Sequence, residues 1–286
     1  VTYDKSQILV SCGAKHSLYN LFQALIDPGD EVIIPTPYWV SYPDQVLLAD
    51  GTPVILQTRE SESHAIDPNA LEACITPKTK ALILNSPNNP SGSIYTRATL
   101  RQVAAIAKKH KMLIISDEIY EKLVFGEPPF LSIVTVAPEC IEQTVVVNGI
   151  SKAYAMTGWR IGYAAGPKDL IAAMSKIQGQ STSNPTSISQ KAAVAALNEG
   201  AAFFEEIVKD LRPKRNFIVE QLNAISGITC PTPSGAFYAY PNVAGLLGRR
   251  YSGGKISTTA ELATYLLEKA HLACCLLYTS PSPRDL

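Results

Sequence analysis

The sequence has no excess of charge of either sign and no long hydrophobic run. Lysine plus arginine and aspartate plus glutamate each number 25, so the net charge gives no reason to expect nucleic acid as a partner. No apolar run approaches the roughly 20 residues of a membrane-spanning helix, and the chain does not open with a basic segment followed by an apolar one. We therefore expect a cytoplasmic protein that binds neither nucleic acid nor a membrane.

Cysteine and histidine are too scattered to define a metal site. The six cysteines lie in apolar stretches, which predicts buried free thiols rather than disulfides. The four histidines lie far apart, without zinc-like spacing to any cysteine pair. We expect no metal. A G-x-G-x-x-G motif is also missing after the first expected strand, which excludes a nicotinamide dehydrogenase.

The sequence does contain short apolar runs that alternate with amphipathic stretches, a pattern typical of an α/β fold. Several runs are unbroken, as in a mostly parallel sheet that is covered on both faces. The seven expected strands are residues 7–11, 31–34, 54–57, 80–84, 112–116, 144–147 and 161–165. Helices are expected between them, among others at residues 18–26, 99–110 and 169–178.

The last third of the chain predicts the beginning of a second domain. The signal is mainly helical over residues 184–226, with interruptions near Gly200 and Pro213. A strand at residues 235–240 and a helix at 259–270 follow, which are too few elements to close a core.

We therefore expect two domains and a tail. The large domain covers residues 1–205, and a partial α+β small domain covers residues 206–273. Residues 274–286 break the pattern and resemble a non-native tail.

Chemically unusual residues follow the expected strands. In open α/β sheets, ligands bind beyond the carboxyl ends of the strands. Asp117 comes directly after the fifth run and Tyr120 lies three residues later, although a helix cap would also explain Asp117. Lys152 follows the sixth run, and Arg160 lies eight residues later. A lysine at such a place is unusual, because lysines normally lie on solvated helix faces.

Together these four residues meet the needs of pyridoxal phosphate. This cofactor requires an amine to form an imine, an anion at its ring nitrogen, donors to its phenolic oxygen and a clamp for its phosphate. Lys152, Asp117, Tyr120 and Arg160 can fill these roles in that order. Arginine suits phosphate because its planar fork donates two parallel hydrogen bonds.

Two further turns are candidates for the same site. Cys12 to Lys15 form a small-residue turn before a helix, which would suit a phosphate but is also a common turn. Residues 85–92, after the fourth run, form a turn rich in asparagine and proline that could equally be a plain loop.

The segments 88–92, 116–121 and 151–162, in this order, resemble the motifs of class I aminotransferases. They are most similar to the prokaryotic aspartate aminotransferase subgroup, and the resemblance extends over roughly residues 1–271. It implies a fold-type I enzyme that works as a homodimer with its active site at the subunit interface.

The resemblance also implies a role for each site residue. Lys152, Asp117 and Tyr120 are catalytic, with Asp117 at the ring nitrogen and Tyr120 together with Asn89 at the phenolic oxygen. Trp39 stacks on the ring, so that Trp39 and Asn89 also border the substrate. The residues expected at the phosphate are Gly13, Ala14, Lys15, Ser151 and Arg160.

Two departures from the family pattern lead us to expect a fragment. The N-terminal segment of the family is missing, and Arg284 does not match the arginine that grips the substrate carboxylate. We expect such a fragment to bind the cofactor less well and to react more slowly than a complete relative.

The resemblance implies transfer of an amino group between an amino acid, aspartate or a similar acid, and a 2-oxo acid. A related pyridoxal-phosphate lyase would share the same cofactor residues, and a module without turnover is a further alternative. The sequence leaves the choice of amino acid open.

Overall fold

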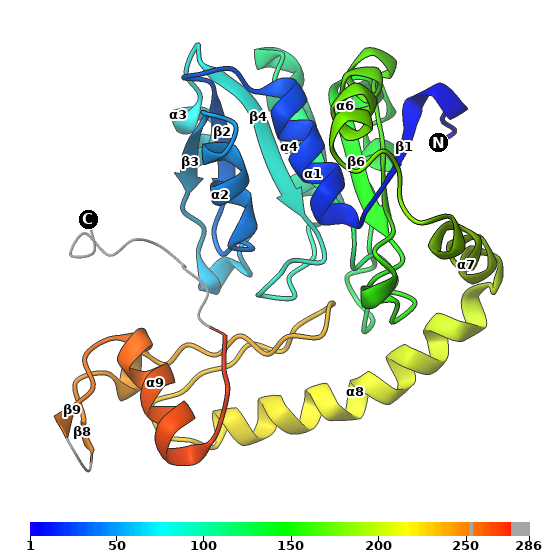
Figure 1. Ribbon diagram of the computed structural model, residues 1–286. Helices are drawn as coiled ribbons and strands as arrows, with labels where there is room; N and C mark the ends of the chain where they lie inside the picture. Colours follow the sequence, from blue (N-terminus) through cyan, green and yellow to red (C-terminus); the bar gives the residue numbers. More distant parts are fainter. Residues whose placement is uncertain (252–253, 276–286) are drawn as a thin grey trace.

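The computed structural model describes residues 1–251 and 254–275, without the side chains of residues 201 and 202 (Figure 1). Its centre is a seven-stranded sheet in the order β1-β7-β6-β5-β4-β2-β3. Each strand overlaps the run that predicted it; the bounds are β1 (Ile8–Ser11), β2 (Glu31–Pro35), β3 (Thr52–Leu56), β4 (Thr79–Asn85), β5 (Leu113–Asp117), β6 (Thr144–Gly149) and β7 (Gly162–Ala165).

The sheet is parallel except for one strand. Strands β3, β2, β4, β5 and β6 pair in parallel, whereas β7 runs antiparallel to both β6 and β1. The carboxyl ends of the parallel strands therefore lie at one edge of the sheet, which faces helix α8 (Figure 1).

Helices cover both faces of the sheet, which explains why its strands are unbroken apolar runs. One face carries α1 (Ala14–Leu25), α2 (Ser41–Leu47) and α6 (Lys168–Ser181), and the other carries α3 (Pro68–Cys74), α4 (Arg97–His110) and α5 (Ile133–Val136). Successive residues of β4 divide between the two cores: Ala81 and Ile83 belong to one, Leu82 and Leu84 to the other.

Two helices lead away from the sheet, α7 (Ser187–Asn198) and the longer α8 (Ala201–Asn223). The expected break at Gly200 is confirmed, since Gly200 separates them with a positive φ of 83°. The expected break at Pro213 is wrong, because Pro213 lies inside α8. A proline removes one helical hydrogen bond, but α8 is also supported by packing, since Leu211 contacts the apolar cluster around Tyr120.

The expected strand at residues 235–240 is also wrong. The structure has a single isolated bridge there, between Val124 and Gly235. The reason is that loops satisfy the backbone: the amides of Ser234 and Gly235 both donate to the carbonyl of Gly92, and Ala236 donates to the carbonyl of Leu123.

The remaining described elements are short, apart from one helix. A hairpin of β8 (Arg250–Tyr251) and β9 (Gly254–Lys255) precedes α9 (Thr259–Ala270), whose bounds match the prediction. Thr258 and Glu261 form a capping box that fixes where α9 begins. The predicted domain boundary at residues 205 and 206 falls within α8 and stays a prediction.

The end of the chain bears on the expected burial of the cysteines and on the expected non-native tail. The expected burial of the cysteines is confirmed for Cys140 and Cys230 but is wrong for Cys274 and Cys275, which are exposed, whereas Cys12 and Cys74 are partly buried. Arg284 and residues 276–286 of the predicted tail lie outside the described residues. Among the helices that the structure describes, none is long and apolar enough to cross a membrane.

Candidate active site

The predicted residues gather at the carboxyl edge of the sheet because their strands are neighbours there. Asn85 and Asp117 are the last residues of β4 and β5 and lie opposite each other in the register. Gly149 ends β6, the next strand, and Lys152 follows in the turn after it. Residues far apart in the sequence therefore meet at one place, as the rule for open α/β sheets predicts.

Asp117 is a buried carboxylate, with 3% of its surface exposed. The hydroxyl of Tyr42 donates to its Oδ2 at 2.7 Å, and the amide of Ile119 donates to its Oδ1 at 3.2 Å. Burial raises the pKa of Asp117 to about 6, although both hydrogen bonds and Lys152 act in the opposite direction. The site therefore holds an anion that a cationic partner would stabilise.

Tyr42 was not predicted from the sequence. It lies in α2 and is 1% exposed, so in the sequence it looks like any other core aromatic residue. Trp39, three residues earlier, contacts Tyr42 edge-on with ring centroids 5.5 Å apart. Tyr42 thus contacts both Asp117 and Trp39, the residue that is expected to stack on the cofactor ring.

The amine of Lys152 faces aromatic rings. Its Nζ lies 5.4 Å from the ring centre of Phe237 and 5.8 Å from that of Tyr120. Burial, followed by the charge of Arg160, lowers the pKa of Lys152, and Asp117 opposes this shift. A larger share of this amine is therefore neutral than on a solvated lysine, as a nucleophile requires.

The Asn89 side chain lies near the Tyr120 hydroxyl, where it opposes the rise that burial causes in the pKa of Tyr120. The backbone amide of Asn89 donates to Oδ1 of Asn85 at 2.7 Å, and Nδ2 of Asn85 donates to the carbonyl of Asp117 at 3.1 Å. The turn after β4 is therefore fastened to the end of β5.

Arg160 lies at the start of helix α1. Its Nη2 donates to the carbonyl of Cys12 at 3.4 Å, and its Nη1 donates to the carbonyl of Thr157 at 2.8 Å. A Cβ on Gly13 would lie only 2.3 Å from Nη2 of Arg160, so glycine is required for this approach. Because the first amides of a helix have no partner within the helix, this corner offers several donors to an anion.

The other predicted phosphate residues lie close in the chain to this corner. Lys15 is exposed in the first turn of α1, and its Nζ lies 4.7 Å from the ring centre of Trp39. Ala14 begins α1, and Ser151 is buried next to Lys152 in the turn after β6. The ten predicted site residues thus lie on the elements that end or begin at this edge of the sheet or in the turns that connect them.

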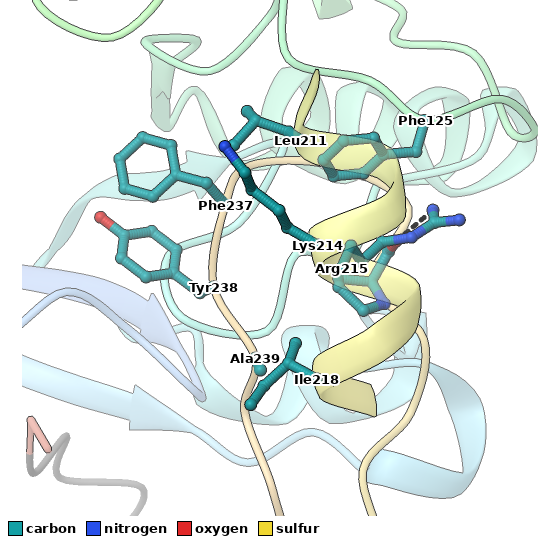
Figure 2. A pocket seen from close by; sticks show the side chains of 9 residues that line it. Phe125, Leu211, Lys214, Arg215, Ile218, Phe237, Tyr238 and Ala239 are labelled. Carbon is teal, nitrogen blue, oxygen red and sulfur yellow. Dashed lines mark hydrogen bonds between the residues drawn. The ribbon is translucent and has the colours of Figure 1, made fainter. Parts of the chain in front are cut away.

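Sequence reasoning also missed Phe237 and Tyr238, which come from the segment wrongly expected to be a strand. A cavity of about 220 Å³ adjoins the site between this segment and α8, and its lining includes both residues (Figure 2). The hydroxyl of Tyr238 lies 2.5 Å from that of Tyr120. Nothing in the spacing of Tyr120 and Tyr238 could have indicated this contact.

Comparison with known proteins identifies the family of this chain. The family model for aminotransferase class I and II matches residues 1–280. The aspartate aminotransferase of Geobacillus stearothermophilus is 49% identical over 274 residues, which are 95% of this chain and 68% of that protein. The aspartate/prephenate aminotransferase of Cereibacter sphaeroides is 48% identical over 273 residues, with the same coverage of both chains.

A solved structure is similar over the whole chain. The crystal structure of the aspartate aminotransferase from Rhizobium meliloti matches with a TM-score of 0.92 and 41% identity, covering 100% of this chain and 74% of that one. The chain belongs to the class I and II aminotransferase family, and its mostly parallel seven-stranded sheet is the fold-type I architecture of the aspartate aminotransferase structures.

Proposed function

We propose that this chain uses pyridoxal phosphate to move an amino group between aspartate, or a similar acid, and a 2-oxo acid. One observation carries the proposal: the amine of Lys152 and the carboxylate of Asp117 share one site, and the pKa of each is displaced by burial. Perturbed pairs of this kind mark sites of proton transfer.

The residues at the site fit the cofactor. Asp117 is a buried anion whose raised pKa shows that it lacks a sufficient counter-charge, and a protonated ring nitrogen would supply one. Asn89 and Tyr120 supply polar donors next to each other. Arg160 beside Gly13 offers a cation at a helix start, which suits a phosphate.

When bound, pyridoxal phosphate supplies an aldehyde for the substrate amine and a ring that draws electron density from the Cα–H bond. The Nζ of Lys152 would then be the base that takes the proton from Cα and delivers it to the C4' carbon of the cofactor. Asp117 would keep a proton on the ring nitrogen, while Tyr42 orients the carboxylate through the 2.7 Å hydrogen bond to Oδ2.

The proposal of an acidic substrate is supported by the relatives. The protein from Geobacillus stearothermophilus is an aspartate aminotransferase, and the one from Cereibacter sphaeroides acts on aspartate and prephenate, as its name states. The homodimer and the cytoplasmic location remain predictions.

The test is a single-turnover reaction of the cofactor-loaded protein with aspartate, glutamate and alanine. We expect amination of the cofactor and an equal amount of 2-oxo acid, fastest with aspartate or glutamate. A lyase would instead release product without amination of the cofactor.

A second measurement tests the lysine. Reduction of the loaded protein with borohydride, followed by peptide mapping, should place the cofactor on Lys152. Attachment to Lys15 or another lysine would contradict the proposal.

A further inference from the structure

Two tyrosine hydroxyls meet at the candidate site. Tyr120 and Tyr238 are 118 positions apart in the sequence, yet their hydroxyl oxygens are 2.5 Å apart. The side chain of Asn89 also lies near this hydroxyl of Tyr120. The Tyr120 oxygen therefore has one tyrosine hydroxyl within hydrogen-bond distance and an amide side chain nearby.

The backbone around Tyr238 is fastened to the site on both sides. Gly235 donates to the carbonyl of Gly92 at 2.9 Å, in the turn that also carries Asn89, and Ala236 donates to the carbonyl of Leu123 at 2.9 Å. A Cβ on Gly92 would lie 2.6 Å from the carbonyl oxygen of Gly235. The two backbone segments therefore approach each other as closely as glycine permits.

Ring packing fixes the direction of the Tyr238 side chain. The ring of Tyr120 contacts Phe237 and Tyr238 edge-on, with centroids 5.5 Å and 5.7 Å away. The rings of Phe237 and Tyr238 lie next to each other on one segment, 4.8 Å apart (Figure 2). The contact between the two hydroxyls is therefore part of a packed arrangement.

Counting hydrogens shows what this contact can do. A phenol has one proton to donate and can accept two hydrogen bonds. Across the 2.5 Å contact, only one of the two hydroxyls can be the donor. If Tyr238 donates to Tyr120, the proton of Tyr120 itself stays available for another acceptor.

We propose that Tyr238 is a positioning residue which donates to Tyr120, so that the Tyr120 proton is directed at the phenolic oxygen of the cofactor. The inference rests on the proposed function, which places Tyr120 at that oxygen. A donor whose own oxygen accepts hydrogen bonds is a stronger donor, because hydrogen-bond chains polarise one another. Tyr238 thereby stabilises the ionised phenolic oxygen through Tyr120.

The test is a double-mutant cycle of Tyr238→Phe and Tyr120→Phe in the loaded protein. Two quantities are measured: the dissociation constant of the cofactor and the pH midpoint of its visible absorbance change. Tyr240→Phe is the matched control, since it makes the same change two residues away, where the ring faces His64. Phenylalanine keeps the ring contacts, and circular dichroism checks that each variant is folded.

We expect Tyr238→Phe to raise the dissociation constant about fivefold, the equivalent of one neutral hydrogen bond, and to raise the pH midpoint. In the Tyr120→Phe background the same change should have less than a twofold effect, and Tyr240→Phe should have none. Equal effects of Tyr238→Phe in both backgrounds, or no effect in either, would overturn the inference alone. No effect of Tyr120→Phe itself would overturn the role of Tyr120 in the proposed function as well.

Discussion

The burial of the ionised Asp117 carboxylate lowers the free energy of unfolding of the protein. Its carboxylate is buried and its pKa is raised from 3.8 to about 6. The folded state therefore holds this proton more tightly than the unfolded state does. Stability contributed by this group is lost as the pH rises from about 4 to about 6 and stays low above that range.

Asp117→Asn should stabilise the cofactor-free protein while it abolishes most turnover. A difference of about two pKa units corresponds to roughly 3 kcal/mol, less about 1 kcal/mol for a weaker hydrogen bond from Tyr42. Urea unfolding at pH 8 should show the gain, and unfolding near pH 4 should not. An equal gain at both pH values would show that the charge of Asp117 is not the cause.

Tyr42→Phe should raise the pKa of Asp117 further, because it removes a donor that favours the ionised carboxylate. A hydrogen bond to a charged group is worth roughly 1.5–3 kcal/mol, or about one pKa unit or more. Carbon-13 NMR of the Asp117 carboxyl in the cofactor-free protein measures the shift. Tyr38→Phe, a buried tyrosine of the same stretch, is the control.

Arg160→Ala should weaken cofactor binding far more than it slows the reaction at saturating cofactor. The loss of a charge-assisted contact of roughly 1.5–3 kcal/mol implies at least about a tenfold higher dissociation constant. Fluorescence titration with pyridoxal phosphate measures this constant. An unchanged value would remove Arg160 from the phosphate site.

At the scale of elements, the start of α1 is held by close backbone contacts with β7. A Cβ on Gly162 would lie 2.1 Å from the amide nitrogen of Ala14 and 2.4 Å from the carbonyl carbon of Gly13. These are backbone atoms, so α1 itself would have to move.

Gly162→Ala should therefore destabilise the protein by roughly 1–3 kcal/mol and weaken cofactor binding. Gly179→Ala is the matched control: Gly179 lies in α6 with no atom within 4 Å of its added Cβ, and alanine there should stabilise by about 0.5–1 kcal/mol. Thermal unfolding of both variants gives the comparison. An unchanged unfolding temperature of Gly162→Ala would mean that α1 can shift without loss of stability.

The helices and strands could be predicted from the sequence where neighbouring residues determine the conformation of the backbone. Unbroken apolar runs marked all seven strands, and the polar residues after them marked Asp117 and Lys152. Pro213 and residues 235–240 were mispredicted because packing and loop carbonyls, which lie far away in the sequence, decide their conformation. Tyr42 and Tyr238 were missed for the same reason, since each reaches its partner only through the folded chain.

At the scale of the whole molecule, α7 exposes large aliphatic side chains. Ile188 is 72% exposed and Val194 is 57% exposed. Exposed apolar surface of this kind is common at subunit interfaces, so α7 is a candidate for the predicted homodimer.

Ile188→Glu should halve the mass measured by sedimentation equilibrium if α7 lies at that interface, because a charge would be buried without a partner. Leu267→Glu on α9, at a side chain that is 54% exposed, is the control and should leave the mass unchanged. A dimer that survives Ile188→Glu would exclude α7 from its centre.

The place of β7 between β1 and β6 in the sheet has a consequence for synthesis on the ribosome. Strand β1 pairs with β7, and about 150 residues separate the end of β1 from the start of β7. At about 5–20 residues per second, β1 waits roughly 8–30 s for its partner to be translated. Arg160 emerges just before β7, so the proposed phosphate site at Gly13 and Arg160 forms only at this late stage of synthesis.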